Sequence, residues 1–292
     1  MKPIVSCEIC NNNNFKILYK KGIIEKGGAV INFDNQVCKN CGLVFLNPQP
    51  EAGDYKSIYQ KYELSRHECK TEKDVNNLID QTNNKNKSEN IFNFIKEYLN
   101  NEKKVLDIGC GFGHISEGLK KRGCDVSAVE PSELLSRVVS QRSGINVFNG
   151  EFDDFYTQNN NKFNVVIMQH VFEHFIDPNN KLEQFKNILL PEGVIYMEIP
   201  NVASFKKPVN NFFDYMHPFN YSPYTIKKIV EKNGYKIIKV NKDKKYRIQF
   251  IISLKTDNHK DVGDDGFWNK GSYGFIKFFI LWRGLIDKIK NK

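Results

Sequence analysis

A short apolar segment runs directly into alternating glycines in Val105-Leu-Asp-Ile-Gly-Cys-Gly-Phe-Gly113. The apolar residues are typical of a buried strand, and Asp107 stands two positions before the first glycine. Glycine lets a backbone pass close to a ligand, and a helix that begins behind such a loop offers free N–H groups and the positive end of its dipole. We therefore expect a ligand-binding loop between a strand and a helix.

A second acidic residue narrows the kind of ligand. Glu130 ends the next predicted strand, 23 positions after Asp107, where a carboxylate can accept both hydroxyls of a ribose. The GxGxG spacing differs from the GxGxxG of dinucleotide-binding loops. The two features together predict a nucleoside ligand that lacks a pyrophosphate.

Strand-like and helix-like segments alternate outward from this loop, which predicts an α/β fold with a parallel sheet covered on both faces. The last two strand patterns follow each other with only a short turn between them, which predicts an antiparallel hairpin at the edge of the sheet. The predicted strands are 105–108, 126–129, 146–148, 163–168, 194–199, 236–240 and 247–254, and the predicted helices are 114–122, 132–142, 178–190 and 222–233.

Two CxxC pairs precede this region, Cys7 with Cys10 and Cys38 with Cys41. Two such turns can complete a tetrahedral site, so we predict a zinc ribbon with one structural zinc; the alternative is four unliganded thiols. Four thiolates leave no open position for water, and so short a segment cannot fold on its own apolar surface alone. Strands are expected at 15–19 and 29–33, with a turn at Gly27-Gly28 between them.

Length and composition limit the alternatives. The 292 residues are 40% hydrophobic and 26% charged, which fits a globular chain. No apolar run approaches the roughly 20 residues of a spanning helix, and no signal-peptide pattern is seen at the N-terminus, so we expect a cytoplasmic protein. The predicted division is a zinc ribbon at 1–52, a helical connector at 53–87, the α/β domain at 88–256 and a basic amphipathic tail at 257–292.

These motifs resemble the S-adenosylmethionine site of class I methyltransferases, which have a Rossmann-like seven-stranded sheet. The resemblance includes Val105–Gly113, Val129-Glu-Pro-Ser132, and Gln169-His-Val-Phe-Glu-His174 with Asp177-Pro178. The segment Cys38-Lys-Asn-Cys-Gly-Leu-Val-Phe-Leu-Asn-Pro48 is similar to the zinc-ribbon methyltransferases that modify sugars and nucleotide sugars. The resemblance covers roughly residues 5–255.

The resemblance also implies roles for single residues. The glycines would line the methionine and ribose portions of the cofactor, Asp107 would reach its amino end and Glu130 its ribose. Phe152 would flank the adenine, with Glu151 or Asp153 at its amino group, and Gln169 and His170 would lie beside the methyl group. The implied cofactor-binding residues are Asp107, Gly109, Gly111, Phe112, Gly113, Glu130, Pro131, Glu151, Phe152, Asp153, Gln169 and His170.

His217 is the candidate general base, because its segment follows the fifth strand and an imidazole suits proton removal at neutral pH. Tyr215 could orient the acceptor, and Glu173-His174 form a second candidate acid–base pair. Related sugar C-methyltransferases carry Glu-His at this place, whereas this chain has Met216-His217. Since removal of a proton from carbon needs a better supported base, the change favours O-methylation.

Charge distribution bears on the partners. The net charge of +9 is concentrated at residues 236–248 and 270–292, which leaves a nearly neutral body and argues against nucleic-acid binding. The segment 275–289 predicts a basic amphipathic helix, which would lie on an anionic membrane at its inner face, pack on the body or form a homodimer. A small-molecule or glycan substrate is expected.

The sequence therefore predicts methyl transfer to a hydroxyl of a sugar, nucleotide sugar or surface glycan. Three alternatives remain open at this stage: a sugar C-methyltransferase, a methyltransferase of another small molecule or of RNA, and a non-catalytic, cofactor-binding scaffold bridged by zinc.

Overall fold

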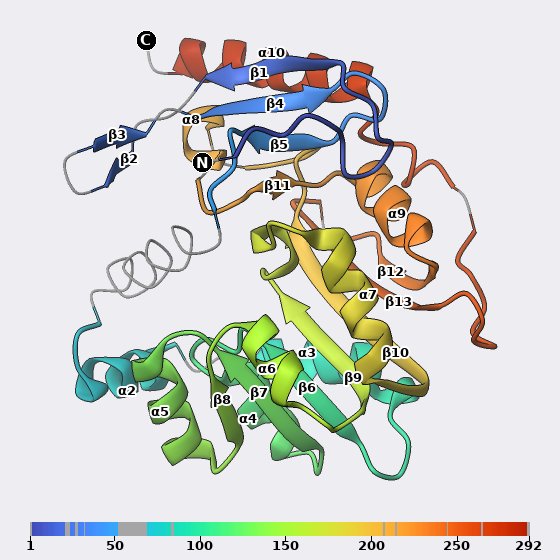
Figure 1. Ribbon diagram of the computed structural model, residues 1–292. Helices are drawn as coiled ribbons and strands as arrows, with labels where there is room; N and C mark the ends of the chain where they lie inside the picture. Colours follow the sequence, from blue (N-terminus) through green and yellow to red (C-terminus); the bar gives the residue numbers. More distant parts are fainter. Residues whose placement is uncertain are drawn as a thin grey trace.

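The molecule consists of a seven-stranded α/β sheet and a smaller antiparallel sheet beside it (Figure 1). The computed structural model describes residues 2–20, 24–26, 29–31, 33–51, 69–82, 85–206, 208–213, 215–243, 245–263 and 265–290. The predicted turn at Gly27-Gly28 and residues 53–68 of the predicted connector lie outside this set. The described part of the connector holds the helix α2 (Glu72–Gln81) and the start of α3 (Lys85–Ile95), which continues past the predicted boundary at residue 87.

The large sheet has the strand order β12-β13-β10-β9-β6-β7-β8. Strands β6 to β10 run parallel, while β13 is antiparallel to both β10 and β12. The predicted seven-stranded, mostly parallel sheet with an antiparallel hairpin is therefore confirmed. Its strands are β6 (Lys104–Ile108), β7 (Asp125–Glu130), β8 (Asn146–Asn149), β9 (Phe163–Gln169), β10 (Leu189–Pro200), β12 (Tyr235–Asn241) and β13 (Arg247–Leu254).

Helices cover both faces of this sheet because each of them turns an apolar stripe inward. One core lies beneath α6, α7 and α9, and a second lies beneath α3 and α4. The helices that follow α3 and pack on the sheet are α4 (His114–Lys120), α5 (Glu133–Ser143), α6 (Phe152–Gln158), α7 (Pro178–Ile188) and α9 (Pro223–Lys232).

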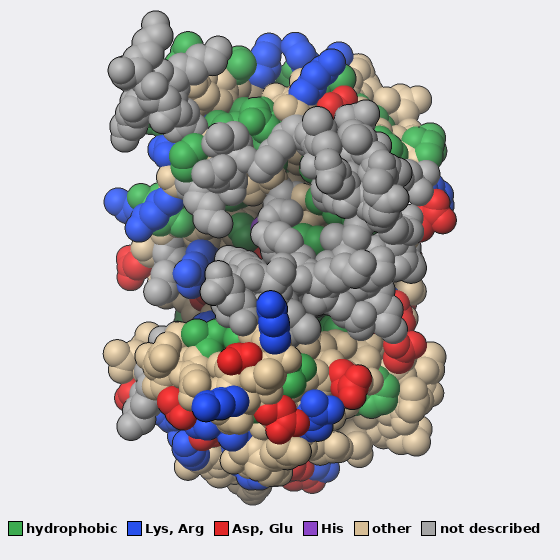
Figure 2. All heavy atoms as spheres, turned by 90° about the vertical axis from the view of Figure 1, so that its left-hand side faces the viewer, with side chains coloured by type: hydrophobic (Ala, Val, Ile, Leu, Met, Phe, Trp, Pro, Cys, Tyr) green, Lys and Arg blue, Asp and Glu red, His purple; other side chains and the backbone are tan. Residues whose placement is uncertain are grey.

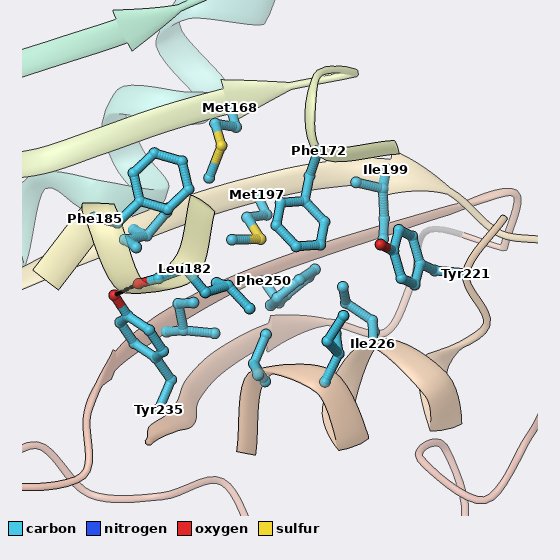
Figure 3. Close-up of a cluster of buried hydrophobic side chains, with 14 of the residues drawn as sticks. Met168, Phe172, Leu182, Phe185, Met197, Ile199, Tyr221, Ile226, Tyr235 and Phe250 are labelled. Atoms are coloured by element: carbon cyan, nitrogen blue, oxygen red, sulfur yellow. Dashed lines mark hydrogen bonds between the residues drawn. The ribbon is translucent and has the colours of Figure 1, made fainter. Parts of the chain in front are cut away.

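The first core is the layer between α7, α9 and the strands β9, β10 and β13 (Figure 3). Met168, Met197 and Phe250 come from the strands, and Phe185 and Ile226 come from the helices. The hydroxyl of Tyr235 donates a hydrogen bond of 2.8 Å to the carbonyl oxygen of Leu182, so the polar end of this buried ring is satisfied. This layer fixes the carboxyl ends of the strands on which the candidate site is built.

The small sheet has the order β1-β4-β5-β11, with β1 (Phe15–Lys20), β4 (Asp34–Cys38) and β5 (Val44–Asn47) from the N-terminal region. The strand predicted at 29–33 differs: β3 (Ala29–Ile31) pairs with β2 (Ile24–Lys26), and the partner of β1 is β4. Pairing with β4 sets Phe15 opposite Cys38 and so brings the two CxxC turns together.

The fourth strand of this sheet, β11 (Phe219–Asn220), belongs to the chain after the large sheet's fifth strand. Contacts from Glu8 strengthen the connection, since its carbonyl oxygen accepts hydrogen bonds from Asn179 of α7 and Lys232 of α9. The N-terminal part of the chain is thus connected to the rest of the molecule through β11 and through the contacts of Glu8 with α7 and α9.

The C-terminal helix α10 (Tyr273–Lys290) lies along β1 at the outer side of the small sheet (Figure 1). Its buried residues Ile276 and Ile280 pack with Val37, Val44 and residues around the short helix α8 (Val209–Phe212). The tail predicted at 257–292 therefore contains a helix with one face against the body.

Candidate active site and cysteine cluster

The glycine loop follows β6 with three left-handed residues, since φ is 68° at Gly109, 54° at Gly111 and 73° at Gly113. A Cβ atom at Gly109 would lie 2.6 Å from Val171, and one at Gly113 would lie 2.5 Å from Val139. A Cβ atom at Gly111 would meet no atom within 4 Å. The outer glycines are required by packing, and the middle one borders open space at the carboxyl end of β6.

Asp107 is buried just below this loop, where the hydroxyl of Ser116 donates a hydrogen bond of 2.5 Å to its carboxylate. Burial raises the pKa of Asp107 to about 6, although the Ser116 hydrogen bond and the nearby charge of Lys87 act in the opposite direction. Lys87 and Ser116 were not singled out in the sequence, because neither stands in a recognisable motif.

Glu130 ends β7 and turns its carboxylate toward the same loop. Its two oxygens accept backbone N–H hydrogen bonds, one from Gly111 and one from Ser132, each 2.9 Å long. An ionised carboxylate has about four acceptor positions, so such a group can accept more than two hydrogen bonds. Phe112 and Pro131 are half-buried on either side, and Phe112 packs against the cluster around Leu135.

The segment 151–153 begins α6, a helix that the sequence analysis did not predict. Phe152 is 3% exposed, and its ring centroid lies 4.9 Å from that of Phe185 in the core. Asp153 forms an ion pair with Lys181 of α7. These contacts turn Phe152 toward the core, whereas Asp153 is exposed at the surface beside α7. The adenine roles of both, and of half-buried Glu151, stay predictions.

Gln169 and His170 leave β9 beside Glu198 of β10, a buried carboxylate that the sequence analysis missed. Glu198 accepts hydrogen bonds from Gln169 at 3.1 Å and Arg247 at 2.9 Å, and the Nε2 atom of His170 lies 3.5 Å from it. Burial opposes ionisation of Glu198, but His170 and Arg247 outweigh it and lower its pKa to about 2. Its position near the end of a predicted strand was the one signal in the sequence.

His170 adopts φ of 57°, an uncommon conformation for a residue other than glycine, and its Nδ1 atom lies 3.4 Å from Glu173. Burial alone would lower the pKa of His170, but the hydrogen bonds and negative charges of Glu173 and Glu198 raise it to about 9. At neutral pH this imidazole is therefore a cation and not a proton acceptor.

Glu173, His174 and His217 converge within the site. One carboxylate oxygen of Glu173 and one ring nitrogen of each histidine lie within 4.8 Å of one another. The two imidazole rings are 4.9 Å apart at their centroids. Glu173 is 2% exposed, and its Oε2 atom has no hydrogen-bond partner among the described residues. Burial opposes its ionisation, yet the surrounding histidines, His170 foremost, lower its pKa. Three such side chains could also hold a divalent metal ion.

His174 is oriented by a hydrogen bond to the backbone. The Nδ1 atom of His174 lies 2.6 Å from the carbonyl oxygen of Met216 and donates to it, which leaves Nε2 as the atom with a lone pair. Position 216 carries no glutamate, but Glu173 from the η2 turn (Phe172–His174) places a carboxylate near His217.

The small sheet holds the segment that carries His217. Leu46 of β5 donates a hydrogen bond of 2.9 Å to the carbonyl oxygen of Pro218, and Phe219 pairs with Phe45. Tyr215 is buried, with its ring 5.2 Å from that of Phe33, so it serves as a packing residue in this structure. Its predicted role at the acceptor remains a prediction.

The four cysteines of the small sheet form one cluster, as their spacing predicts. The Sγ atoms of Cys7 and Cys41 are 3.5 Å apart, and those of Cys10 and Cys38 are 3.6 Å apart. Such distances are far longer than a disulfide bond, and they match the separation of roughly 3.8 Å that Zn–S bonds of about 2.3 Å give in a tetrahedron. The cluster therefore fits a zinc ion.

The strand order, the glycine loop after the first strand and the acidic residue after the second define a class I methyltransferase, the class that uses S-adenosylmethionine. The family described as a methyltransferase domain matches residues 81–240, which is more than half of the chain. The chain belongs to this family.

Two curated relatives and one solved structure illustrate the similarity. A ubiquinone biosynthesis O-methyltransferase of Actinobacillus pleuropneumoniae is 31% identical over 109 residues, 34% of this chain and 46% of the relative, so the chain spans about half of that protein. A methyltransferase of Oceanobacillus iheyensis is 25% identical over 162 residues, 54% of this chain and 74% of the relative. Magnesium protoporphyrin IX methyltransferase of Synechocystis, solved with bound S-adenosylmethionine, is 16% identical with a TM-score of 0.49, covering 70% of this chain and 99% of that one.

Proposed function

We propose that this protein transfers the methyl group of S-adenosylmethionine to a hydroxyl group of a sugar, a nucleotide sugar or a surface glycan. The observation that carries the proposal is the convergence of Glu173, His174 and His217 at the carboxyl end of β9. Ligands bind at the carboxyl ends of the strands in folds of this kind. A buried carboxylate beside an imidazole is the arrangement that a general base needs.

The residues around the glycine loop fit the cofactor. Open space above Gly111 allows a ligand to approach the backbone, and the Glu130 carboxylate at the end of β7 can accept ribose hydroxyls in addition to its two backbone bonds. Asp107 lies at the base of the loop, near the charge of Lys87. When bound, S-adenosylmethionine supplies an electrophilic methyl group on a positively charged sulfur.

The side chains of this chain then position the acceptor and take its proton. His217 would accept the proton of the acceptor hydroxyl while the acceptor oxygen bonds to the methyl carbon. The bond between that carbon and the sulfur would break in line, with S-adenosylhomocysteine as the leaving group. The negative charge of Glu173 stabilises the imidazolium that forms, as a buried carboxylate does in other histidine bases. His170 is already protonated at neutral pH, since its pKa is raised to about 9, so it cannot be the base.

Two observations bear on the atom that is methylated. The curated relative with 31% identity is named an O-methyltransferase, which supports an oxygen acceptor. The proximity of Glu173 to His217 supports the second candidate, methylation at carbon, because it provides the stronger base that such a reaction needs. The sugar class rests on the resemblance of the cysteine-containing segment to ribbons of sugar-modifying enzymes.

The small sheet is proposed to form one wall of the acceptor site, with one structural zinc held by Cys7, Cys10, Cys38 and Cys41. The support is the pairing of β11 with β5, since it joins the segment of His217 to the sheet that the cysteines hold together. A zinc ion with four thiolates has no open position for substrate, so its contribution is structural.

The proposal is tested in two steps. Calorimetric titration with S-adenosylmethionine and S-adenosylhomocysteine should show binding, and Glu130→Ala should weaken it. Incubation with the labelled cofactor, nucleotide sugars and cell-envelope extracts should then yield a methylated product, whose NMR spectrum distinguishes oxygen from carbon. Absence of binding would overturn the whole proposal, whereas binding without any transfer to these acceptors would favour a non-catalytic, cofactor-binding protein.

A further inference from the structure

The helix α10 carries an apolar stripe on its exposed face. The side chains of Phe278, Leu281, Trp282 and Leu285 are 69%, 60%, 49% and 61% exposed. Their spacing of three, four and seven positions places them on one side of a helix, because residues at these intervals lie above one another. A stripe of large exposed apolar side chains marks a contact surface rather than ordinary surface composition.

The opposite face of α10 is already in use. Ile276 and Ile280 are buried against the small sheet, and the ring of Phe279 lies 5.2 Å from that of Phe205 in an edge-to-face contact. Arg283 donates a hydrogen bond of 2.7 Å to the carbonyl oxygen of Lys206. The helix is thus fixed on the body by one side, and the apolar stripe faces away from it.

Positive charge surrounds this stripe. Lys277 is exposed on the same helix, whose sequence contains one acidic residue, Asp287. Lys16 and Lys20 are exposed on β1, the strand that lies along α10 (Figure 1). Lys and Arg side chains are present at this upper end of the molecule in the space-filling view, as they are elsewhere on the same face (Figure 2). Basic residues also dominate the C-terminal segment 270–292 as a whole.

We infer that α10 lies on the surface of an anionic lipid bilayer, with Phe278, Leu281, Trp282 and Leu285 inserted at the boundary between head groups and acyl chains. A helix with aromatic and leucine residues on one face and basic residues beside them has the chemistry of an interfacial helix. Within the described part of the chain, no helix is long and apolar enough to span a bilayer.

The positive charge beside the apolar stripe favours a lipid surface, rather than a second copy of this chain, as the partner that covers the stripe. A symmetric dimer through α10 would bring two basic segments together, and like charges that meet across an interface oppose association. An anionic lipid surface instead attracts each lysine and arginine near it. The same positive charge that disfavours the dimer therefore favours the bilayer.

The chain contains its own probe for this contact. It has two tryptophans, of which Trp268 is 1% exposed and Trp282 is 49% exposed. On mixing with vesicles of equal parts phosphatidylglycerol and phosphatidylcholine, the emission of Trp282 should shift to shorter wavelength. Vesicles of phosphatidylcholine alone should give no shift. The variant Trp282→Phe should lose the shift, because Trp268 is already shielded from water.

Sedimentation with the same vesicles tests the stripe directly. The double variant Phe278→Gln/Leu281→Gln should bind about tenfold or more weakly than the unaltered chain, and high salt should weaken the binding of the unaltered chain. Val5→Gln is the matched control, since Val5 is an exposed apolar residue outside α10 at 74% exposure, and it should bind normally. Light scattering of the same samples reports the oligomeric state.

Three results would overturn the inference. The first is no binding to the anionic vesicles at low salt, and the second is binding that the double variant leaves unchanged. The third is a dimer that the double variant converts to a monomer without vesicles, which would assign the stripe to a second copy of the chain. Since the vesicle experiments need neither cofactor nor acceptor, their outcome is independent of the proposed methyl transfer.

Discussion

A carboxylate oxygen of Glu173 and an imidazole nitrogen of His217 lie within 4.8 Å of each other, although one residue follows β9 and the other precedes β11. The large sheet places the first residue, and the pairing of β11 with β5 places the second. The proposed proton removal at this site would therefore require that both sheets are correctly joined.

The first prediction concerns this pair. His217→Ala should lower turnover about 100-fold or more, the size typical of a general base, and leave the affinity for S-adenosylhomocysteine unchanged. Glu173→Gln should also lower turnover, because the imidazolium loses its counter-charge. His259→Ala serves as control, since His259 packs against Tyr98 outside the site. Steady-state kinetics and calorimetry measure both quantities, and normal turnover of His217→Ala would remove this residue from the mechanism.

The second prediction separates the binding role of Gly111 from its backbone strain. Gly111→Ala and Gly123→Ala both place a Cβ atom at positive φ, with nothing within 4 Å in either case. Each should cost about 1 kcal/mol of unfolding free energy, the usual penalty for a left-handed alanine. Only the change at position 111 should weaken cofactor binding, because Gly123 follows α4 at the far end of that helix. Equal cofactor affinity in the two variants would contradict the assignment.

The third prediction concerns pH and His170. Its pKa is raised from 6.5 to about 9 by Glu173 and Glu198, against the effect of burial, so the folded state binds the proton more tightly than the unfolded state. The resulting stabilisation is complete below pH 6.5 and is lost as the pH rises through about 9. Asparagine tolerates the left-handed backbone at this position, so His170→Asn is the suitable variant.

Urea unfolding of both proteins across this range measures the effect. The unaltered chain should be more stable than His170→Asn by a constant amount below pH 6.5. This difference should shrink between pH 6.5 and 9, because deprotonation removes the charge that Glu173 and Glu198 stabilise. A difference that grows with pH would show that His170 is held in its neutral form.

The parts of this molecule that could be predicted are those that a local pattern encodes. The apolar run before Gly109 and the alternation after it indicated the positions of the strands along the chain and a mostly parallel sheet, because burial on both faces requires continuous apolar segments. The CxxC spacing likewise indicated the cysteine cluster, since one turn suffices to direct two sulfurs at one point. These features need no knowledge of distant residues.

The parts that could not be predicted depend on register between distant segments. Glu198 meets Arg247 because β13 pairs with β10 in a register that opposes Pro200 to Arg247, and no local pattern specifies that register. Strand β11 has two residues, too few for any periodicity, yet it brings His217 to Glu173. Position 216 therefore gives no sign of the carboxylate near His217, because Glu173 is distant from it in the sequence.

The last prediction joins the cysteine cluster to catalysis. The unaltered protein should contain about one zinc ion per chain, the number that one site of four thiolates holds. Cys10→Ser should remove most of it, because Cys10 is one of the four clustered thiols, with Cys38 3.6 Å from its sulfur. Cys124→Ser is the control, since Cys124 is a buried thiol outside the cluster. Metal analysis by mass spectrometry distinguishes the two.

The same variants should separate turnover from cofactor binding. Loss of the metal should loosen the small sheet, in which β5 contacts Pro218 and Phe219, and so should let His217 move away from Glu173. Turnover should fall by about tenfold or more, as expected when a general base is displaced. Binding of S-adenosylhomocysteine should persist, because the glycine loop and Glu130 belong to the large sheet, and this binding also shows that the variant is folded. A metal-free Cys10→Ser protein with full turnover would show that the cysteine cluster does not support the base.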